Sequence, residues 1–322
     1  MDNSPSTPAV SVIVPAYNVT PFIADALDSL RTQTFRDFET IVVNDGCPDT
    51  ANLERVLEPY RSEIVYIRQE NRGLAGARNT AIRAARAPLV ALLDSDDAWE
   101  PDYLEVQTGF LAEHAQTDVV SPNAFFVGET PFLGKTVTDL FPTRGPVSFG
   151  SLLARDNHIF VGVTVRREAI LRAGLFDPAL RSAEDLDLWL RMAHGGASFM
   201  YHGRPLVRYR ARPDSLSNDP IWIITHVLQV YRKLSETLVL SLPDRACLEG
   251  AIRREEANLD FYLGKKALYS GRIQEARERL GRANEVLRNR KTTFALLALR
   301  IAPGLLHKMV RWHSPTEYEF LH

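Results

Sequence analysis

The first third of the chain alternates between strand-like and helix-like patterns four times, and this alternation limits the fold more than any other feature. Short β-branched apolar runs are each followed by a segment whose apolar residues recur every three or four positions. The predicted strands cover 10–15, 38–43, 64–68 and 89–93, and the predicted helices cover 20–30, 50–57, 73–85 and 101–112. Thr20 is expected to cap the first helix, with Pro21 at its first position. Short connections between alternating elements predict an α/β fold with a doubly wound, mainly parallel sheet.

Polar side chains gather where the predicted strands end. Tyr17, Asp45, Asp94 and Asp96 close or follow three of the strands, and Arg78 lies early in the third helix. In sheets of this kind, ligands bind beyond the carboxyl ends of the strands. The sequence therefore predicts a binding site at this edge of the sheet.

Three carboxylates stand within four residues after the fourth strand, in Asp94-Ser95-Asp96-Asp97. Crowded carboxylates repel one another unless a cation or a proton lies among them. Mg²⁺ and Mn²⁺ are held by one or two carboxylates together with substrate phosphates. One interpretation is therefore a divalent metal site, and the alternative is a polar loop in which Asp97 caps the next helix.

Beyond residue 119 the pattern is less regular. A further strand is expected at 161–165 and a short helix at 168–173, before an amphipathic helix at 184–191 that begins with two acidic residues. Acidic residues in a first turn commonly only stabilise the helix dipole, so this pattern by itself does not establish a catalytic role. After Ser217 the chain is expected to be helical to its end.

Size, charge and cysteine usage narrow the class of protein. A chain of 322 residues is expected to form one large domain with a smaller one appended. Residues 221–322 contain 17 Lys+Arg and 11 Asp+Glu, whereas the remainder contains 21 and 29, and an acidic body argues against a nucleic-acid groove. Cys47 and Cys247 form no metal-ligand pair, no apolar stretch is long enough to span a membrane, and the polar start is unlike a signal peptide.

Six motifs occur in a fixed order, and together they resemble glycosyltransferase family 2, whose members are inverting enzymes of the GT-A fold. The motifs are Val-Ile-Val-Pro-Ala-Tyr-Asn at 12–18, Val-Asn-Asp-Gly at 43–46, Asn-Arg-Gly-Leu-Ala-Gly-Ala-Arg-Asn at 71–79, Leu-Asp-Ser-Asp-Asp at 93–97, Gly-Leu-Phe-Asp at 174–177, and Glu-Asp-Leu-Asp-Leu-Trp-Leu-Arg at 184–191. Each motif alone is weak, but six in this order are specific. The resemblance covers roughly residues 11–217.

The resemblance implies a role for each matching residue. Asp185 corresponds to the catalytic base that takes a proton from the acceptor hydroxyl, and Asp45 to the carboxylate that accepts from the uracil N3–H. Asp94 and Asp96 match the Asp-x-Asp motif that meets the ribose and the metal, expected to be Mn²⁺ or Mg²⁺. The implied nucleotide-binding residues are Pro15, Tyr17, Asp45, Arg78, Asp94 and Ser95, with Arg78 beside the diphosphate. The implied acceptor-binding or supporting residues are Glu184, Asp97, Trp189 and Arg212.

Two positions depart from the family pattern. Asn44 precedes Asp45 where members often carry a double aspartate, so only Asp45 is left to recognise the base. Arg212 stands where many members carry a histidine, and an arginine cannot ligate a metal. A metal would therefore rest on the aspartates, the diphosphate and water, and Arg212 either contacts the diphosphate or lies on the surface.

The predicted function is metal-dependent transfer of a sugar from a UDP- or dTDP-sugar to a glycan or lipid-linked acceptor in cell-surface polysaccharide synthesis. A phosphatase of the haloacid-dehalogenase type is disfavoured because Ala98 stands where it needs Thr or Val. A nucleotidyltransferase is disfavoured because Pro15-Ala16-Tyr17 stands where it needs a glycine loop. The alternative left open is a nonenzymatic nucleotide-sugar sensor or scaffold acting through the helical tail.

The predicted organisation is a disordered tail at 1–9, a catalytic domain at 10–219 with nucleotide-binding (10–118) and acceptor (119–219) halves, and a helical region at 220–322. Residues 263–283 resemble one tetratricopeptide-like hairpin, with a helical extension packed on the catalytic domain as the alternative. Residues 286–316 contain no acidic side chain, and their basic residues flank an apolar helix, which suits either an anionic membrane surface or a second subunit of a homodimer. The expected location is the cytoplasm, either free or peripheral on the inner face of the cell membrane.

Overall fold

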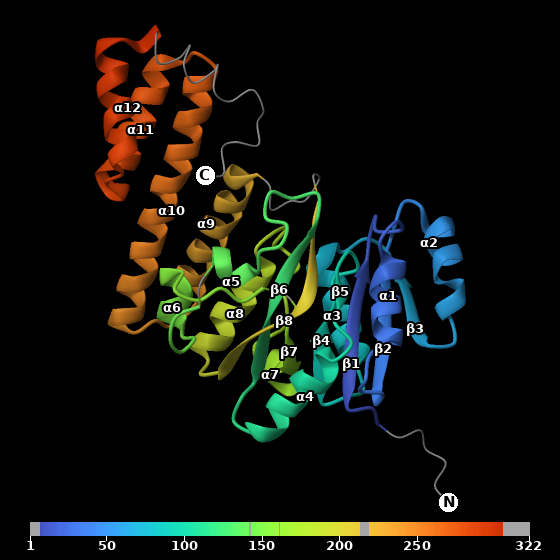
Figure 1. The fold of residues 1–322 in the computed structure, drawn as a ribbon. Helices are drawn as coiled ribbons and strands as arrows, with labels where there is room; N and C mark the ends of the chain where they lie inside the picture. The colour runs from blue at the N-terminus through green and yellow to red at the C-terminus, as the bar shows by residue number, and fades with distance from the viewer. Residues whose placement is uncertain (1–6, 142, 161, 213–218, 305–322) are drawn as a thin grey trace, which may run out of the picture. The chain divides into compact units, whose positions relative to one another are not determined.

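The computed structural model describes residues 7–141, 143–160, 162–212 and 219–304. The chain divides into two compact units, residues 1–213 and 214–322 (Figure 1). Most of the tail expected at 1–9, the Ser215–Ser217 segment and the part of 286–316 that follows residue 304 lie outside the described residues.

Eight strands of the first unit form one sheet, in the order β3-β2-β1-β4-β7-β6-β8-β5. The parallel half, predicted from the alternation, consists of β1 (Val10–Ala16), β2 (Phe38–Asp45), β3 (Ile64–Gln69) and β4 (Leu89–Leu92). The other half consists of β7 (Thr164–Arg166), β6 (Val119–Gly128), β8 (Phe199–Ala211) and β5 (Ala98–Trp99). There β6 and β8 are parallel, whereas β7 is antiparallel to β4 and β6, and β5 to β8. The predicted α/β fold with a mainly parallel sheet is therefore confirmed.

Helices follow the first three strands of the parallel half, and a fourth helix follows β5. They are α1 (Ile23–Arg31) after β1, α2 (Thr50–Leu57) after β2, α3 (Gly73–Ala84) after β3 and α4 (Tyr103–Glu113) after β5. A short 3-10 turn, η1 (Glu58–Tyr60), follows α2. The second half of the unit contains α5 (Val137–Leu140), α6 (Phe149–Ala154), α7 (Arg167–Arg172) and α8 (Glu184–His194).

Three expected boundaries differ from the structure. α1 begins at Ile23 and not at Thr20, because the backbone N–H groups of Phe22 and Ile23 both donate to Val19 O and close a turn first. The strand expected at 161–165 is confined to Thr164–Arg166 among the described residues. Asp97 caps no helix: α4 begins at Tyr103, after Asp102.

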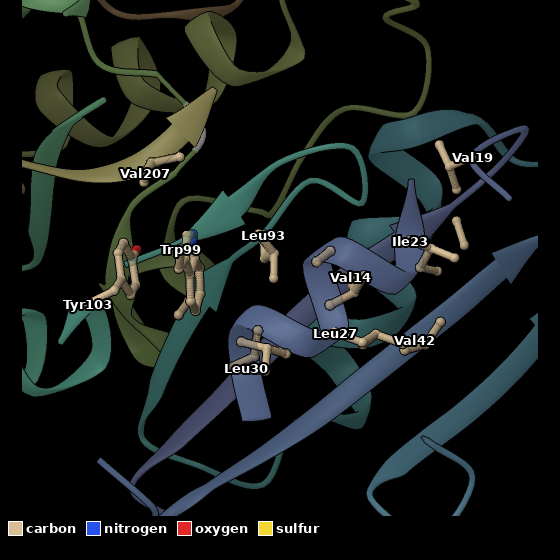
Figure 2. Close-up of a cluster of buried hydrophobic side chains, with 14 of the residues drawn as sticks. Val14, Val19, Ile23, Leu27, Leu30, Val42, Leu93, Trp99, Tyr103 and Val207 are labelled. Carbon is tan, nitrogen blue, oxygen red and sulfur yellow. The ribbon is translucent and has the colours of Figure 1, made fainter. Parts of the chain in front are cut away.

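The apolar face of α1 packs on the parallel strands. Figure 2 shows Ile23, Leu27 and Leu30 of this helix on the side of the sheet that carries Val14 of β1 and Val42 of β2. Each of these five side chains is at most 3% exposed. The intervening residues of β1 and β2 are buried as well, so these strands are covered on both faces, as parallel sheets require.

The second unit is helical and consists of α9 (Pro220–Thr237), α10 (Leu242–Tyr269), α11 (Ile273–Leu287) and α12 (Arg290–Ile301). α10 and α11 form a hairpin that turns at Gly271, whose φ of +74° favours glycine. Its interior contains Ala267, Ala276 and Leu280, each at most 5% exposed. Among the described residues, no helix combines the length and the apolar character that crossing a bilayer requires.

We predict that Gly264→Ala lowers the free energy of unfolding, by about 1–2 kcal/mol, because the helices of the hairpin approach too closely for a side chain. A Cβ atom at residue 264 would lie 2.8 Å from Leu280 Cγ. Gly281→Ala is the matched control, since a Cβ there meets nothing within 4 Å and removes only the helix penalty of glycine. Urea unfolding followed by circular dichroism measures both, and equal stability of the two variants would contradict the close approach.

Candidate active site

The acidic turn at residues 94–97 lies at the switch point of the sheet. β1 is flanked by β2 on one side and by β4 on the other, so the switch point lies at the carboxyl ends of β1 and β4, where sheets of this kind bind ligands. Ser95 Oγ donates to Pro15 O at 2.7 Å, which ties these two strand ends together. The side chains of Asp94 and Asp96 are each 29% exposed, whereas Asp97 is buried. The turn therefore presents two carboxylates where folds of this kind bind ligands.

One buried cation, Arg78, connects the acidic turn to helix α8. The Arg78 side chain is 1% exposed, and its Nη2 donates to Asp94 Oδ1 at 2.7 Å. Its Nη1 donates to Glu184 Oε1 at 2.6 Å. Charge-assisted bonds of this length are among the stronger polar contacts in proteins. The expected place of Arg78 was beside a diphosphate, but in the structure both Nη atoms bind carboxylates of the protein.

Asp185, the expected base, stands next to this ion network. α8 begins after Ala183, whose φ is +57°, and Glu184 then meets Arg78. Asp185 is only partly exposed, and its Oδ1 accepts from the backbone N–H of Leu186 at 2.8 Å. Burial raises the pKa of Asp185 to about 7; Glu184 adds to the rise and Arg78 opposes it. A carboxyl group whose pKa lies near neutrality is suited to general-base catalysis at physiological pH.

Residues from two other motifs, those at 174–177 and 184–191, surround Arg78 or its immediate neighbours. Asn79 Nδ2 donates to Phe176 O at 2.8 Å, and Asn79 Oδ1 accepts from Phe176 N at 3.0 Å. The guanidinium carbon of Arg78 lies 5.3 Å from the centroid of the Phe176 ring. Trp189 lies edge-on to Phe176 and is fully buried, so of the two roles expected for Trp189 only support is compatible with its position.

Asp45 closes β2 and is held by residues that sequence reasoning did not identify. Its Oδ1 accepts from Gln69 Nε2 at 2.6 Å and from the backbone N–H of Arg72 at 2.9 Å. Gln69 is oriented in turn by Thr80, whose Oγ1 donates to Gln69 Oε1 at 2.6 Å. A pocket of about 490 Å³ adjoins Asp45 and is lined by Gly46, Cys47, Thr50, Arg68, Gln69 and Glu70. Tyr17, at the end of the neighbouring β1, is 48% exposed.

Two arginines at the end of β8 contact the acidic turn. The backbone N–H of Arg210 donates to Asp97 Oδ1 at 2.8 Å, and its Nε donates to Asp96 O at 2.8 Å. Arg212 Nη1 binds Asp96 Oδ2 at 3.1 Å, and its guanidinium carbon lies 4.8 Å from the centroid of the Phe22 ring. Arg212 is thus paired with Asp96, an expected metal ligand. Its side chain is 17% exposed, so it does not lie free on the surface.

The charge balance of the turn bears on metal binding. Burial raises the pKa of Asp96, as does the charge of Asp94, whereas Arg212 opposes the rise. Burial also raises the pKa of Asp97 well above its usual range, and both neighbouring aspartates add to this. A cation near Asp94 and Asp96 would relieve their repulsion.

The donor set fits a divalent ion only in part. In the part of the chain that the structure describes, no group of three or more His, Cys, Asp or Glu side chains is arranged to hold a metal. The bonds to Arg78 and Arg212 use one oxygen each of Asp94 and Asp96. These residues therefore suit an ion that is shared between two carboxylates and the phosphates of a ligand.

The structure links most of the expected site residues through direct contacts. Asp94, Arg78 and Glu184 form one chain of contacts, and Asp96 and Arg212 form a second. Asp45 belongs to a separate hydrogen-bonded group with Gln69 and Arg72. Sequence reasoning missed the supporting residues, which are Phe22, Gln69, Arg72, Asn79 and Arg210. Only Asn79 and Arg72, which lie within the motif at 71–79, had a signal that could have identified them.

We predict that Arg78→Met lowers the free energy of unfolding by about 3–5 kcal/mol, because it leaves the carboxylates of Asp94 and Glu184 without their buried partner. Arg86→Met is a matched control, since Arg86 also binds a carboxylate, that of Glu39, but its own side chain is 51% exposed. Equilibrium unfolding in urea at pH 7.5 measures both variants. Equal losses for the two would show that the Arg78 network contributes no more than a half-exposed ion pair.

Comparisons with known proteins agree with this architecture. A family model described as "Glycosyl transferase family 2" matches residues 11–167. The "Putative teichuronic acid biosynthesis glycosyltransferase TuaG" of Bacillus subtilis (strain 168) is 30% identical over 232 residues, which make up 70% of this chain and 88% of TuaG. The match to the "Putative glycosyltransferase EpsH" of the same organism is 40% identical over 132 residues and spans 41% of this chain and 37% of EpsH.

Two solved structures share the fold. TarS (residues 1–349) of S. aureus, in complex with UDP-GlcNAc, superposes with a TM-score of 0.63 at 19% identity, covering 94% of this chain and 90% of that one. The mannosyltransferase PcManGT of Pyrobaculum calidifontis, in complex with GDP-Man and Mn²⁺, gives a TM-score of 0.61 at 21% identity, covering 97% and 87%. At these identities the likeness concerns the fold.

Proposed function

This chain belongs to glycosyltransferase family 2, and on that premise we propose that it is a metal-dependent, inverting glycosyltransferase. It moves a sugar from a UDP- or dTDP-sugar to a glycan or lipid-linked acceptor of a cell-surface polysaccharide. The observation that carries the proposal is the Arg78 bridge, which joins Asp94 of the acidic turn to Glu184, the residue before Asp185. A carboxylate site for the donor and a carboxylate suited to general-base work are thereby fixed relative to each other.

The proposed chemistry divides the work between these residues. Asp94 and Asp96 would hold Mn²⁺ or Mg²⁺ together with the donor diphosphate, and the ion would offset the charge that develops on the departing nucleoside diphosphate. Asp185 takes the proton of the acceptor hydroxyl as that oxygen attacks the anomeric carbon. Arg78 and Glu184 position the two carboxylate sites, and Asp97 holds the β8 backbone through Arg210 N. A single displacement of this kind inverts the anomeric configuration.

The alternative function is a nonenzymatic nucleotide-sugar sensor or scaffold. A sensor needs the donor site but has no use for a carboxylate whose pKa is raised to about 7 beside it. Incubating the protein with Mn²⁺ and a panel of nucleotide sugars, with and without glycan acceptors, tests the proposal. Release of nucleoside diphosphate supports an enzyme, and tight binding without any release of product supports the sensor.

Replacing Asp185 with Asn tests the base directly. We expect transfer to fall by about 10²–10⁴-fold, because the amide keeps the shape but cannot accept the proton. In the wild type, kcat is expected to rise with pH through about 7, as the carboxyl group ionises, and this limb is expected to be absent from Asp185→Asn. Binding of UDP and Mn²⁺, measured by calorimetry, is the control and is expected to change little. Near-normal turnover of the variant, or retention of the anomeric configuration by NMR, would exclude Asp185 as the base.

The donor base is proposed to be uracil or thymine, recognised by Asp45 in the pocket that adjoins it. We expect UDP and dTDP to bind more tightly than GDP, because the Asp45 carboxylate can accept from the N3–H that both pyrimidines carry. Asp45→Ala is expected to weaken UDP binding by about 1–3 kcal/mol through loss of a buried hydrogen bond. Calorimetry with the three diphosphates and Mn²⁺ measures this. Tighter binding of GDP, the nucleotide part of the GDP-Man bound to PcManGT, would contradict the assignment.

The end of the helical unit is proposed to attach the enzyme to an anionic membrane surface without spanning it. Phe294, Leu297 and Ile301 recur on one face of α12 and are 71%, 47% and 83% exposed. Arg290 and Lys291, both exposed, open the same helix, and residues 286–304 contain no acidic side chain. An exposed apolar stripe among basic side chains suits the interface of an anionic bilayer, and such attachment would bring the enzyme to a lipid-linked acceptor.

We expect the full-length protein to sediment with anionic liposomes at low salt, and raised salt to release it, because the basic side chains are exposed and screened. Replacing Phe294, Leu297 and Ile301 together with Ser is expected to abolish sedimentation. Leu133→Ser is the matched control, since Leu133 is also exposed, at 68%, but lies in the first unit. If the wild type ignores anionic liposomes and instead dimerises through these residues in sedimentation velocity, α12 is a subunit contact.

A further inference from the structure

Arg212 pairs with the carboxylate of Asp96, which is also one of the two carboxylates proposed to hold the metal ion. Its Nη1 lies 3.1 Å from Asp96 Oδ2, and its guanidinium packs over the Phe22 ring. The Arg212 side chain is only 17% exposed, so salt screens this pair less than a surface pair. In the donor-free protein, Arg212 thus neutralises part of the charge that would otherwise attract a cation.

We infer that Arg212 is a resident counter-cation of Asp96, and that it makes metal binding depend on the donor diphosphate. The inference rests on the proposed function, since it takes Asp94 and Asp96 as the metal-binding residues. Without a diphosphate, a divalent ion meets a carboxylate already paired with a guanidinium, and the two positive charges repel each other. A bound diphosphate supplies anionic oxygens to both cations, and guanidinium groups bind phosphate oxygens well. Metal and nucleotide therefore bind cooperatively, with Arg212 as the positioning residue that couples them.

Arg210, the other arginine at this turn, does not fit the role. Its Nε donates to the backbone oxygen of Asp96, and its Nη2 donates to Asp25 Oδ2 at 2.8 Å. These bonds fix the backbone of the acidic turn and leave the Asp96 carboxylate to Arg212. The coupling is thus assigned to one side chain of the two.

The coupling can be measured from either side. By linkage, the factor by which UDP raises the affinity for Mn²⁺ equals the factor by which Mn²⁺ raises the affinity for UDP. Arg212→Gln removes the charge and keeps a planar group that can donate to Asp96. We expect it to tighten the binding of Mn²⁺ alone roughly tenfold and to change the binding of Mn²⁺ in the presence of UDP much less, so that the coupling factor falls. Arg212→Lys keeps the charge and is expected to bind Mn²⁺ alone as weakly as the wild type.

The experiment titrates the full-length protein with Mn²⁺ and follows the free ion by electron paramagnetic resonance, with and without saturating UDP. Arg208→Gln is the matched control. It removes one positive charge from β8, the strand that precedes Arg212, but Arg208 pairs with Glu100 at 2.7 Å and is 53% exposed. The affinity for Mn²⁺ alone is expected to be unchanged in this control, which separates a local effect from one of net charge.

Two results would overturn the inference in different ways. If Mn²⁺ and UDP together bind Arg212→Gln and the wild type with the same coupling factor, and Mn²⁺ alone binds both equally, then Arg212 does not couple the two ligands, while the proposed function stands. If the wild type binds no UDP even with Mn²⁺ present, the proposed function fails and the inference fails with it.

Discussion

The candidate active site depends on the ion network of one buried guanidinium. Arg78 is 1% exposed and binds Asp94 on one side and Glu184 on the other. A buried charge is tolerated only when its partners satisfy it, and removing a partner leaves an uncompensated charge at high cost. The acidic turn and the start of α8 therefore cannot shift independently of each other. Their relative position is set by this network, although 106 residues separate Arg78 from Glu184 along the chain.

The same network explains why the adjacent acidic residues Glu184 and Asp185 have different partners. Glu184 binds Arg78 directly, whereas Asp185 accepts from the backbone N–H of Leu186 and carries a pKa raised by burial and by Glu184. At the other end of the site, Arg212 pairs with Asp96, so each carboxylate of the Asp-x-Asp motif has its own arginine. Carboxylates and guanidinium groups thus lie close together in the site. A divalent cation and a diphosphate that bind together add charges of opposite sign, so the net charge of the site changes little.

The sequence predicted the parts of the structure that local patterns determine. The alternation of strand-like and helix-like apolar spacing predicted the four parallel strands, and the carboxylates after β4 predicted the acidic turn. Both features are visible in the sequence because they depend on residues only a few positions apart. The start of α1 was predicted wrongly because Thr20 looks like a helix cap in the sequence. In the structure a turn closed on Val19 O precedes the helix, which begins only at Ile23. The Arg78–Glu184 bridge and the Gln69–Asp45 bond could not be predicted, since their partners meet only in the folded sheet. The burial of Arg78 and Trp189 could not be predicted either, because both residue types also occur at exposed ligand sites.

Asp94 and Glu184 are coupled through Arg78, and a double-mutant cycle of Asp94→Asn and Glu184→Gln tests this coupling most directly. Each single variant leaves the guanidinium one carboxylate, whereas the double variant leaves it neither. Measured as the free energy of unfolding in urea, the loss in the double variant is predicted to exceed the sum of the single losses by about 1 kcal/mol or more. Losses that add to within about 0.5 kcal/mol would show that the turn and the helix are held independently, and would contradict the account.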